Sequence, residues 1–264
     1  MFLKSILLAL AFVIPTASSA AQCGDTGSGF NAWKAAFANE AARAGVGQRG
    51  LQALANATYQ TSTIRADRNQ KSFRLNLQEF MDLRGANTII AQGRKRRARN
   101  ADFYNALERR FGVPAGVLLA IHGMETGFGG FMGNSPVVSA ITTLTYDCRR
   151  SEFFEPHAIG ALKLVDQGTI TSATQGAKHG ELGHTQFLPG NALRYGVDTN
   201  GDGKLDLYNL SDAMGSTANF LYQKGWQAGR GYQEGQPNFT VIQDWNAAGV
   251  YQKAIAIMAA EIDK

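Results

Sequence analysis

The sequence predicts a mostly α-helical fold for this chain of 264 residues. Apolar residues recur at helical spacing over residues 30–44 and again over residues 73–92. Strand-like alternation is scarce, and the chain contains no internal repeat or long low-complexity tract. The N-terminal part, residues 21–112, is therefore expected to be a region of helices.

The first twenty residues have the build of a cleavable signal peptide. Lys4 precedes an apolar run over residues 6–14, and small residues lead to Ala20. The run is too short to cross a bilayer, and no later segment has the roughly 18 consecutive apolar residues of a transmembrane helix. Because Gln22 before Cys23 fits lipid-anchor processing poorly, we expect cleavage near Ala20 and a periplasmic protein without a lipid anchor.

A boundary falls at residues 111–114, Phe-Gly-Val-Pro. Proline is favoured in the first turn of a helix and pushes the preceding residue out of the helical region. The next helix is therefore predicted over residues 114–125. Further helices are predicted at three places and a short strand at one: helices over 152–167, 211–225 and 252–262, and a strand over 238–244.

The chain is mildly basic, with 26 Lys and Arg residues against 21 Asp and Glu. This balance suits an anionic wall or membrane surface, but an ordinary solvated surface explains it equally well. The basic run over residues 94–99 has the same two interpretations. Export argues against a nucleic acid as the partner.

The two cysteines, Cys23 and Cys148, fit an oxidising compartment. A bridge between them would tie the mature N-terminus to the middle of the chain, and two free thiols are the alternative. Two cysteines and four dispersed histidines give no zinc-type spacing.

Glu125 is the first candidate for a catalytic group. It ends the predicted helix 114–125 among apolar neighbours, and the glycine-rich residues 127–130 follow it. Burial disfavours the charged form of a carboxyl group and raises its pKa, so the group can donate a proton to a leaving-group oxygen at neutral pH. These residues alone leave a structural, hydrogen-bonded glutamate equally open.

Residues 180–189, Gly-Glu-Leu-Gly-His-Thr-Gln-Phe-Leu-Pro, combine glycines with hydrogen-bonding side chains and an aromatic ring. This composition suits the wall of a sugar-binding groove. Glu181 is a candidate for the second carboxylate of a glycosidase pair, although a sequence does not give the distance between the two carboxylates. His184 alone is more typical of a hydrogen-bonded histidine at the edge of a core.

Residues 198–212 contain a match to the calcium loop of an EF-hand. Asp198, Asn200 and Asp202 place side-chain oxygens at alternate positions, and Lys204 offers a backbone carbonyl. The usual closing glutamate is missing, and Asp212 could supply its carboxylate from a longer loop. A structural Ca²⁺ site is predicted, with an Asx-rich turn as the alternative.

Taken together, these motifs resemble the membrane-bound lytic murein transglycosylase B family. The resemblance covers roughly residues 25–262 and keeps the family's order: 111–114, Gly-Met-Glu-Thr-Gly-Phe-Gly at 123–129, the segment 180–189, the calcium loop and Asp-Trp-Asn at 244–246. Each motif alone is modest, but their succession is specific.

The resemblance implies an α+β, lysozyme-like catalytic core over residues 113–264, with the N-terminal helical region packed on it. It also implies cleavage of the β-1,4 bond between N-acetylmuramic acid and N-acetylglucosamine in peptidoglycan, leaving a 1,6-anhydromuramoyl end. In that reaction Glu125 protonates the glycosidic oxygen and then accepts the proton of the muramoyl 6-hydroxyl. The substrate's own acetamido group would stabilise the cationic centre, so no second carboxylate is required.

The same resemblance implies further site residues: Gln186, Phe187, Trp245, Asn246 and Tyr251 for the substrate, and Asp198, Asn200, Asp202, Lys204 and Asp212 for Ca²⁺. Two departures bear on subsite preference. Residues 190–191 are Gly-Asn where relatives often carry a serine pair, and Trp245 stands where tyrosine is common. We expect a monomer whose partner is the glycan strand.

Two other functions remain open at the level of sequence. One is a hydrolytic muramidase that uses Glu125 together with Glu181. The other is a non-catalytic wall-binding protein stabilised by calcium. The chemical nature of the product separates the first from a lytic transglycosylase, and the absence of any cleavage would indicate the second.

Overall fold

The computed structural model describes residues 21–69 and 75–264. Within these residues the elements follow in the order η1 (Gly27–Gly29), α1 (Phe30–Arg43), α2 (Gln48–Asn56), α3 (Thr61–Arg68), α4 (Leu77–Arg84), α5 (Ala86–Arg99), α6 (Ala101–Phe111), α7 (Ala115–Thr126), β1 (Ser135–Pro136), α8 (Val137–Tyr146), α9 (Ser151–Gln167), β2 (Gln175–Gly176), α10 (Pro189–Tyr195), α11 (Leu210–Gln223), α12 (Phe239–Trp245) and α13 (Gly249–Asp263). The mostly helical fold predicted from the sequence is confirmed. The predicted signal peptide, residues 1–20, lies outside the described residues.

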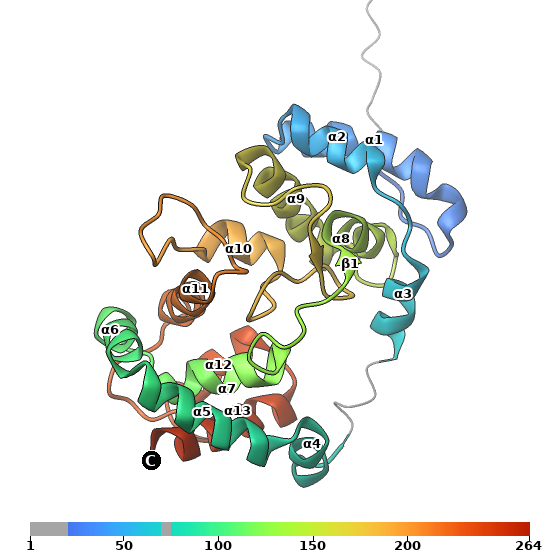
Figure 1. Cartoon of the computed structure of the whole chain (residues 1–264). Helices are drawn as coiled ribbons and strands as arrows, with labels where there is room; N and C mark the ends of the chain where they lie inside the picture. Colours follow the sequence, from blue (N-terminus) through green and yellow to red (C-terminus); the bar gives the residue numbers. More distant parts are fainter. Residues whose placement is uncertain (1–20, 70–74) are drawn as a thin grey trace, which may run out of the picture.

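The helices form two groups, which Figure 1 shows one above the other. The upper lobe consists of α1–α3 and α8–α10, and the lower lobe of α4–α7 and α11–α13. Helices α10 and α11 pack against each other and join the lobes. The short strands β1 and β2 pair antiparallel, with Ser135 opposite Gly176. The helices before residue 113 are thus divided between the two lobes. That residues 21–112 form a separate N-terminal region remains a prediction.

Helix α7 is the central element of the lower lobe. It packs against α5 and α13, and eleven of its twelve residues are buried. Gly116 allows the close approach to α13, because a Cβ atom there would lie 2.3 Å from the Ala259 carbonyl oxygen. Its backbone N–H donates to Asp263 Oδ1 at 2.8 Å. The core therefore holds the helix that carries Glu125 on all sides except its C-terminal end.

Five of the predicted helices are present as α1, α7, α9, α11 and α13, with shifts of a few residues at their ends. The predicted helix over 73–92 is wrong as a single element. Gly85 adopts φ 67°, ends α4 and begins α5, which divides the segment; its first two residues lie outside the described residues. A left-handed residue cannot continue an α-helix, and glycine adopts that conformation readily.

The predicted strand over 238–244 is also wrong, since this segment forms helix α12. Val241 and Ile242 are adjacent and both buried, which a helix on a curved core surface permits and a half-buried strand does not. The buried Asn238 side chain fixes the start of the segment by accepting from Gln227 N–H and donating to the carbonyls of Gln227 and Arg230.

A disulfide bond joins Cys23 to Cys148. Of the two alternatives left open by the sequence, the bridge is therefore present and the two free thiols are not. The neighbouring backbone follows the same path, with Gly24 N–H donating to the Tyr146 carbonyl at 2.9 Å. The Tyr146 hydroxyl in turn donates to the Thr26 carbonyl. Across the described residues, no helix has both the length and the apolar character needed to cross a bilayer.

Candidate active site

Glu125 lies in the last turn of α7, where the helix emerges from the core. Gly127 ends the helix with φ 58°, and the next turn runs over the glycine-rich residues 127–130. The residues that precede Glu125 are buried, whereas its own carboxylate is partly exposed to a cavity. The local sequence therefore delivers one carboxyl group from an apolar helix to an open space.

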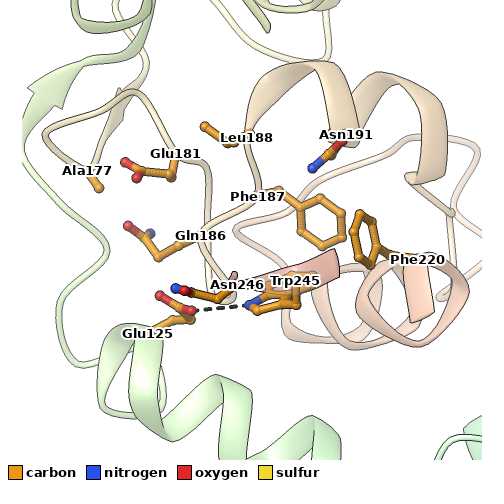
Figure 2. Close-up of a pocket in the computed structure, with 10 residues that line it drawn as sticks. All are labelled: Glu125, Ala177, Glu181, Gln186, Phe187, Leu188, Asn191, Phe220, Trp245 and Asn246. Carbon is orange, nitrogen blue, oxygen red and sulfur yellow. Dashed lines mark hydrogen bonds between the residues drawn. The ribbon is translucent and has the colours of Figure 1, made fainter. Parts of the chain in front are cut away.

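Two donors hold the Glu125 carboxylate. The Tyr251 hydroxyl from α13 donates to Oε1 at 2.6 Å. The Trp245 indole N–H from α12 donates to the same oxygen at 3.2 Å (Figure 2). Burial raises the pKa of Glu125 to about 7, and the nearby charge of Glu181 adds to this shift. The two hydrogen bonds lower the pKa and so limit the rise, because they stabilise the charged form.

A cavity of about 340 Å³ opens in front of Glu125, between the two lobes (Figure 2). Its lining residues come from both lobes: Glu125, Ala177, Glu181, Gln186, Phe187, Leu188, Asn191, Phe220, Trp245 and Asn246. A second cavity of about 580 Å³ shares Glu125, Glu181, Leu188 and Asn246 with the first. The two cavities therefore adjoin at Glu125 and form one groove.

Segment 180–189 forms the wall of the groove opposite Glu125. The backbones of Leu182 and Phe187 pair across a tight turn. Within it Gln186 adopts φ 56°, and its amide donates to the carbonyls of Met132 and Gly183. Phe187 is buried edge-on against Trp245 and Phe220. The turn thus presents the Gln186 side chain to the cavity, while Phe187 anchors the wall to the lower lobe.

Glu181 has a different environment in the same cavity. Its carboxylate lies 3.3 Å from His179 Nδ1 and accepts the His179 backbone N–H at 3.1 Å. Burial lowers the pKa of His179, but the carboxylates of Glu181 and Asp67 outweigh it, and the pKa is raised overall. Asp67 also pairs with Arg149 and Arg150. Glu181 is therefore one member of a charge cluster in the upper lobe.

The predicted calcium loop is folded by hydrogen bonds to its own carboxylates. The two Asp198 carboxylate oxygens accept the N–H groups of Gly201 and Gly203, both at 2.7 Å. Asp212 is fully buried and accepts from Thr199, Asn200 and Asp206. No cluster of three or more His, Cys, Asp or Glu side chains suited to a metal ion occurs within residues 21–69 and 75–264.

The structure brings together most of the residues predicted for the substrate. Glu125, Gln186, Phe187, Trp245 and Asn246 all line the first cavity (Figure 2). Tyr251 is not among them, because it is buried behind Glu125 and its hydroxyl bonds to that carboxylate. The calcium-loop residues Asp198, Asn200, Asp202, Lys204 and Asp212 do not line this groove.

Sequence reasoning missed other residues of the groove. His179 and Arg150 lie near Glu181 in the second cavity, and Asn191 and Phe220 line the first. The only sequence signal for His179 is its place two residues before Glu181. Phe220 lies inside the predicted helix 211–225, where an apolar residue indicates only a core position.

Comparisons with known proteins identify similar sequences and folds. The model of a family described as transglycosylase SLT domain matches residues 29–236. Membrane-bound lytic murein transglycosylase B of Escherichia coli is 33% identical over 130 residues, which are 48% of this chain and 36% of that protein. The aligned part thus spans little more than one third of the length of that curated relative.

Solved structures share the fold. SltB3 from Pseudomonas aeruginosa, solved in complex with NAG-anhNAM-pentapeptide, is 26% identical with a TM-score of 0.78, over 88% of this chain and 79% of that one. Slt35 of Escherichia coli, solved in complex with calcium, is 21% identical with a TM-score of 0.73, over 92% and 96% of the two chains. The predicted lysozyme-like fold is confirmed by these likenesses.

Proposed function

The chain belongs to the transglycosylase SLT domain family, and on that premise we propose that it is a lytic transglycosylase of peptidoglycan. The proposed reaction cleaves the β-1,4 bond between N-acetylmuramic acid and N-acetylglucosamine and leaves a 1,6-anhydromuramoyl end. The observation that carries the proposal is the Glu125 carboxyl group, which has a pKa of about 7 in the middle of a groove. The SltB3 complex with NAG-anhNAM-pentapeptide supports the substrate class.

The pKa of Glu125 suits both halves of this reaction. Near neutral pH the group is populated in both forms, so it can first donate a proton to the glycosidic oxygen. The resulting carboxylate is stabilised by Tyr251 and Trp245 at Oε1, and it then accepts the proton of the 6-hydroxyl as that oxygen closes onto C1. Both bonds reach Oε1, and we assign the proton transfers to Oε2.

The groove wall is proposed to hold the sugar beside this group. Gln186 and Asn246 present amide side chains to the cavity, and Trp245 presents an aromatic ring. Amide groups bond sugar hydroxyl and acetamido groups, and aromatic faces pack against pyranose rings. Because Tyr251 lies behind Glu125, its proposed role is to hold the acid rather than to touch the glycan.

The test is product analysis by mass spectrometry after digestion of wall sacculi. Anhydromuropeptides are expected from the unmutated protein, and none from Glu125→Gln. Reducing-end products would contradict the proposal and indicate a hydrolytic muramidase. Binding to sacculi without any cleavage would indicate a wall-binding protein.

One observation favours the hydrolytic alternative, since Glu125 and Glu181 line the same cavity. A base that activates water must be free to accept a proton. The carboxylate of Glu181 instead faces His179, whose pKa is raised. This pairing supports the lytic reaction over the hydrolytic one.

We further propose that the loop over 198–212 binds Ca²⁺ in a structural role. Asp198, Asn200, Asp202 and the Lys204 carbonyl offer the oxygen donors that Ca²⁺ prefers, and the buried carboxylate of Asp212 closes the loop. The solved Slt35 complex with calcium supports this assignment. Chelation should lower the melting temperature; an unchanged value, with no metal in the purified protein, would reduce the loop to a turn.

The location and assembly of the protein complete the proposal. A periplasmic monomer fits a wall substrate and the Cys23–Cys148 disulfide bond. Cell fractionation tests the location, and light scattering of the purified chain tests the monomer.

A further inference from the structure

Two histidines far apart in the sequence meet directly behind the groove. His122 lies on α7, one turn before Glu125, and is 2% exposed. Its Nε2 atom lies 3.1 Å from Nδ1 of His184, which belongs to the groove wall opposite. The rings meet edge to face at 79°, with centroids 5.1 Å apart. This contact joins the helix that carries the acid to the segment that carries Gln186.

Both rings are neutral at neutral pH. Burial lowers the pKa of His122 to about 3, and the charge of Arg96, like that of His184 when it is protonated, acts in the same direction. Burial also lowers the pKa of His184, against the opposing effects of the Tyr208 backbone and Asp206. A neutral imidazole has one donor and one acceptor, so two neutral rings can share a single hydrogen bond.

The surroundings determine which ring donates. Nδ1 of His122 is buried and has no hydrogen-bond partner in the described part of the chain. A proton on Nδ1 would be a buried donor without an acceptor, which is costly. The proton therefore belongs on Nε2 of His122, which donates to Nδ1 of His184.

A second bridge runs parallel to this bond. The Thr126 hydroxyl donates to the His184 carbonyl at 2.7 Å and accepts the Gly129 N–H at 2.9 Å. Gly129 lies so close to the ring that a Cβ atom there would be 2.5 Å from His184 Cε1. The turn after Glu125 thus contacts His184 through the Thr126 side chain and through the backbone of Gly129.

Backbone strain concentrates on either side of the pair. Among the described residues, Phe128 and Gln186 are the only non-glycine residues with positive φ, at 63° and 56°. Phe128 packs edge-on against His122, and the Arg96 guanidinium lies 4.5 Å from the centre of its ring. Such conformations persist only where packing and hydrogen bonds hold them. Here both strained residues flank the two histidines.

We propose that the His122–His184 hydrogen bond is a positioning device that fixes the Glu125 carboxyl group relative to Gln186 across the groove. The proposal rests on the proposed lytic function. Neither histidine touches the glycan; each acts through its own backbone, His122 on the end of α7 and His184 on the turn that carries Gln186. Loss of the bond shifts the acid from the glycosidic oxygen while the groove still binds its sugar.

The first experiment compares leucine with amide replacements on a soluble, uncrosslinked glycan chain. His122→Leu and His184→Leu remove the bond, and kcat should fall roughly tenfold to a hundredfold, since small misplacements of a catalytic group have effects of this order. The KM value should change little. Gln places an amide near Nε2 and Asn near Nδ1, so His122→Gln and His184→Asn should restore most of kcat.

The control is His157→Leu. His157 is also buried, with an unpartnered Nδ1 and a pKa lowered by burial to about 4, but it lies on α9 rather than on α7 or in the segment 180–189. Its replacement should affect melting temperature without the fall in kcat. Equal kcat values for His122→Leu and the unmutated protein would overturn the proposal while leaving the lytic function intact. An unmutated protein that cleaves no glycan would overturn both.

A measurement on the unmutated protein covers the case in which the leucine variants do not fold. Nitrogen-15 NMR of the imidazole rings at neutral pH should show two neutral rings and a scalar coupling between His122 Nε2 and His184 Nδ1 across the hydrogen bond. Two uncoupled rings, or a protonated His122, would overturn the proposal.

Discussion

The groove contains two carboxylates, and their surroundings differ. Glu125 leaves an apolar helix, and its partners Tyr251 and Trp245 carry no charge. Glu181 sits among charged groups, with His179 beside it and Asp67 paired with arginines beyond. Burial raises the pKa of Glu125 to about 7, whereas Glu181 and Asp67 together raise the pKa of the neighbouring His179. A carboxyl group held by neutral donors alone stays available for proton exchange, whereas the Glu181 carboxylate is already paired with a histidine of a charge cluster.

The largest expected effect is that of Glu125→Gln. The amide keeps both hydrogen-bond positions but exchanges no proton, so the rate of anhydromuropeptide release should fall by at least about a thousandfold, within the range of general acid–base catalysis. Quantitative chromatography of digested sacculi measures it. Glu234→Gln, which changes only an exposed pair with Lys253, is the control. A residual rate above one tenth would remove Glu125 from the centre of the reaction.

The next largest effect is that of Tyr251→Phe, which removes one of the two neutral donors to the Glu125 carboxylate. Its hydroxyl lowers the pKa of Glu125, so its loss raises that pKa further. Glu125 must start protonated, and activity therefore declines as pH rises through its pKa. We expect this decline, the alkaline limb of the pH–activity profile, to shift to a pH about one unit higher. The value of kcat should fall roughly tenfold.

The matched control for this pH profile is Tyr232→Phe. It removes a partly buried tyrosine hydroxyl that bonds to Asp263 instead of Glu125. The alkaline limb should stay in place. An alkaline limb that shifts equally in both variants, or shifts to lower pH in Tyr251→Phe, would show that Tyr251 does not control the pKa of Glu125.

Glu181→Gln should have a smaller effect, in the opposite direction. The charge of Glu181 raises the pKa of Glu125, so its removal lowers that pKa and moves the alkaline limb slightly down. The rate at its optimum should stay within about tenfold of the unmutated value, because no step of the lytic reaction uses this carboxylate. A loss as large as that of Glu125→Gln would favour the two-carboxylate hydrolytic reaction.

The smallest effect concerns stability. The pKa of Glu125 is raised from 4.5 to about 7 in the folded protein, so folding favours its protonated form. The associated stability is fully present below pH 4.5 and is lost as pH rises through 7. Glu125→Gln should therefore melt a few degrees higher than the unmutated protein at pH 8 and nearly equally at pH 4. Calorimetry at both values checks the sign, and a variant less stable at pH 8 would contradict it.

The sequence predicted what local chemistry determines. Apolar spacing and Pro114 located α7 and thus Glu125 at its end, and glycines marked the turn that follows. The strand over 238–244 failed because β-branched residues indicated extended backbone, whereas the buried Asn238 starts a helix. Such a bond to residues 227 and 230 depends on the tertiary fold and has no local signature.

The sequence could not predict which side chains pair with one another in the site, because these pairs also depend on the tertiary fold. His122 and His184 are 62 residues apart, and Tyr251 is 126 residues from the carboxylate that it holds. His122 and Tyr251 are ordinary buried residues of their helices, and His184 is a partly buried residue of a turn. Their roles exist only once both lobes are assembled.

The chain path through the two lobes has a mechanical consequence. Helix α3 belongs to the upper lobe and α4 to the lower lobe; the chain returns to the upper lobe between α7 and α8 and passes down again between α10 and α11. Neither lobe is a continuous stretch of polypeptide, so neither can be excised as one segment. The described connections over residues 127–136 and 196–209 both run from one lobe to the other, so moving the two walls of the groove apart would extend both connections at once.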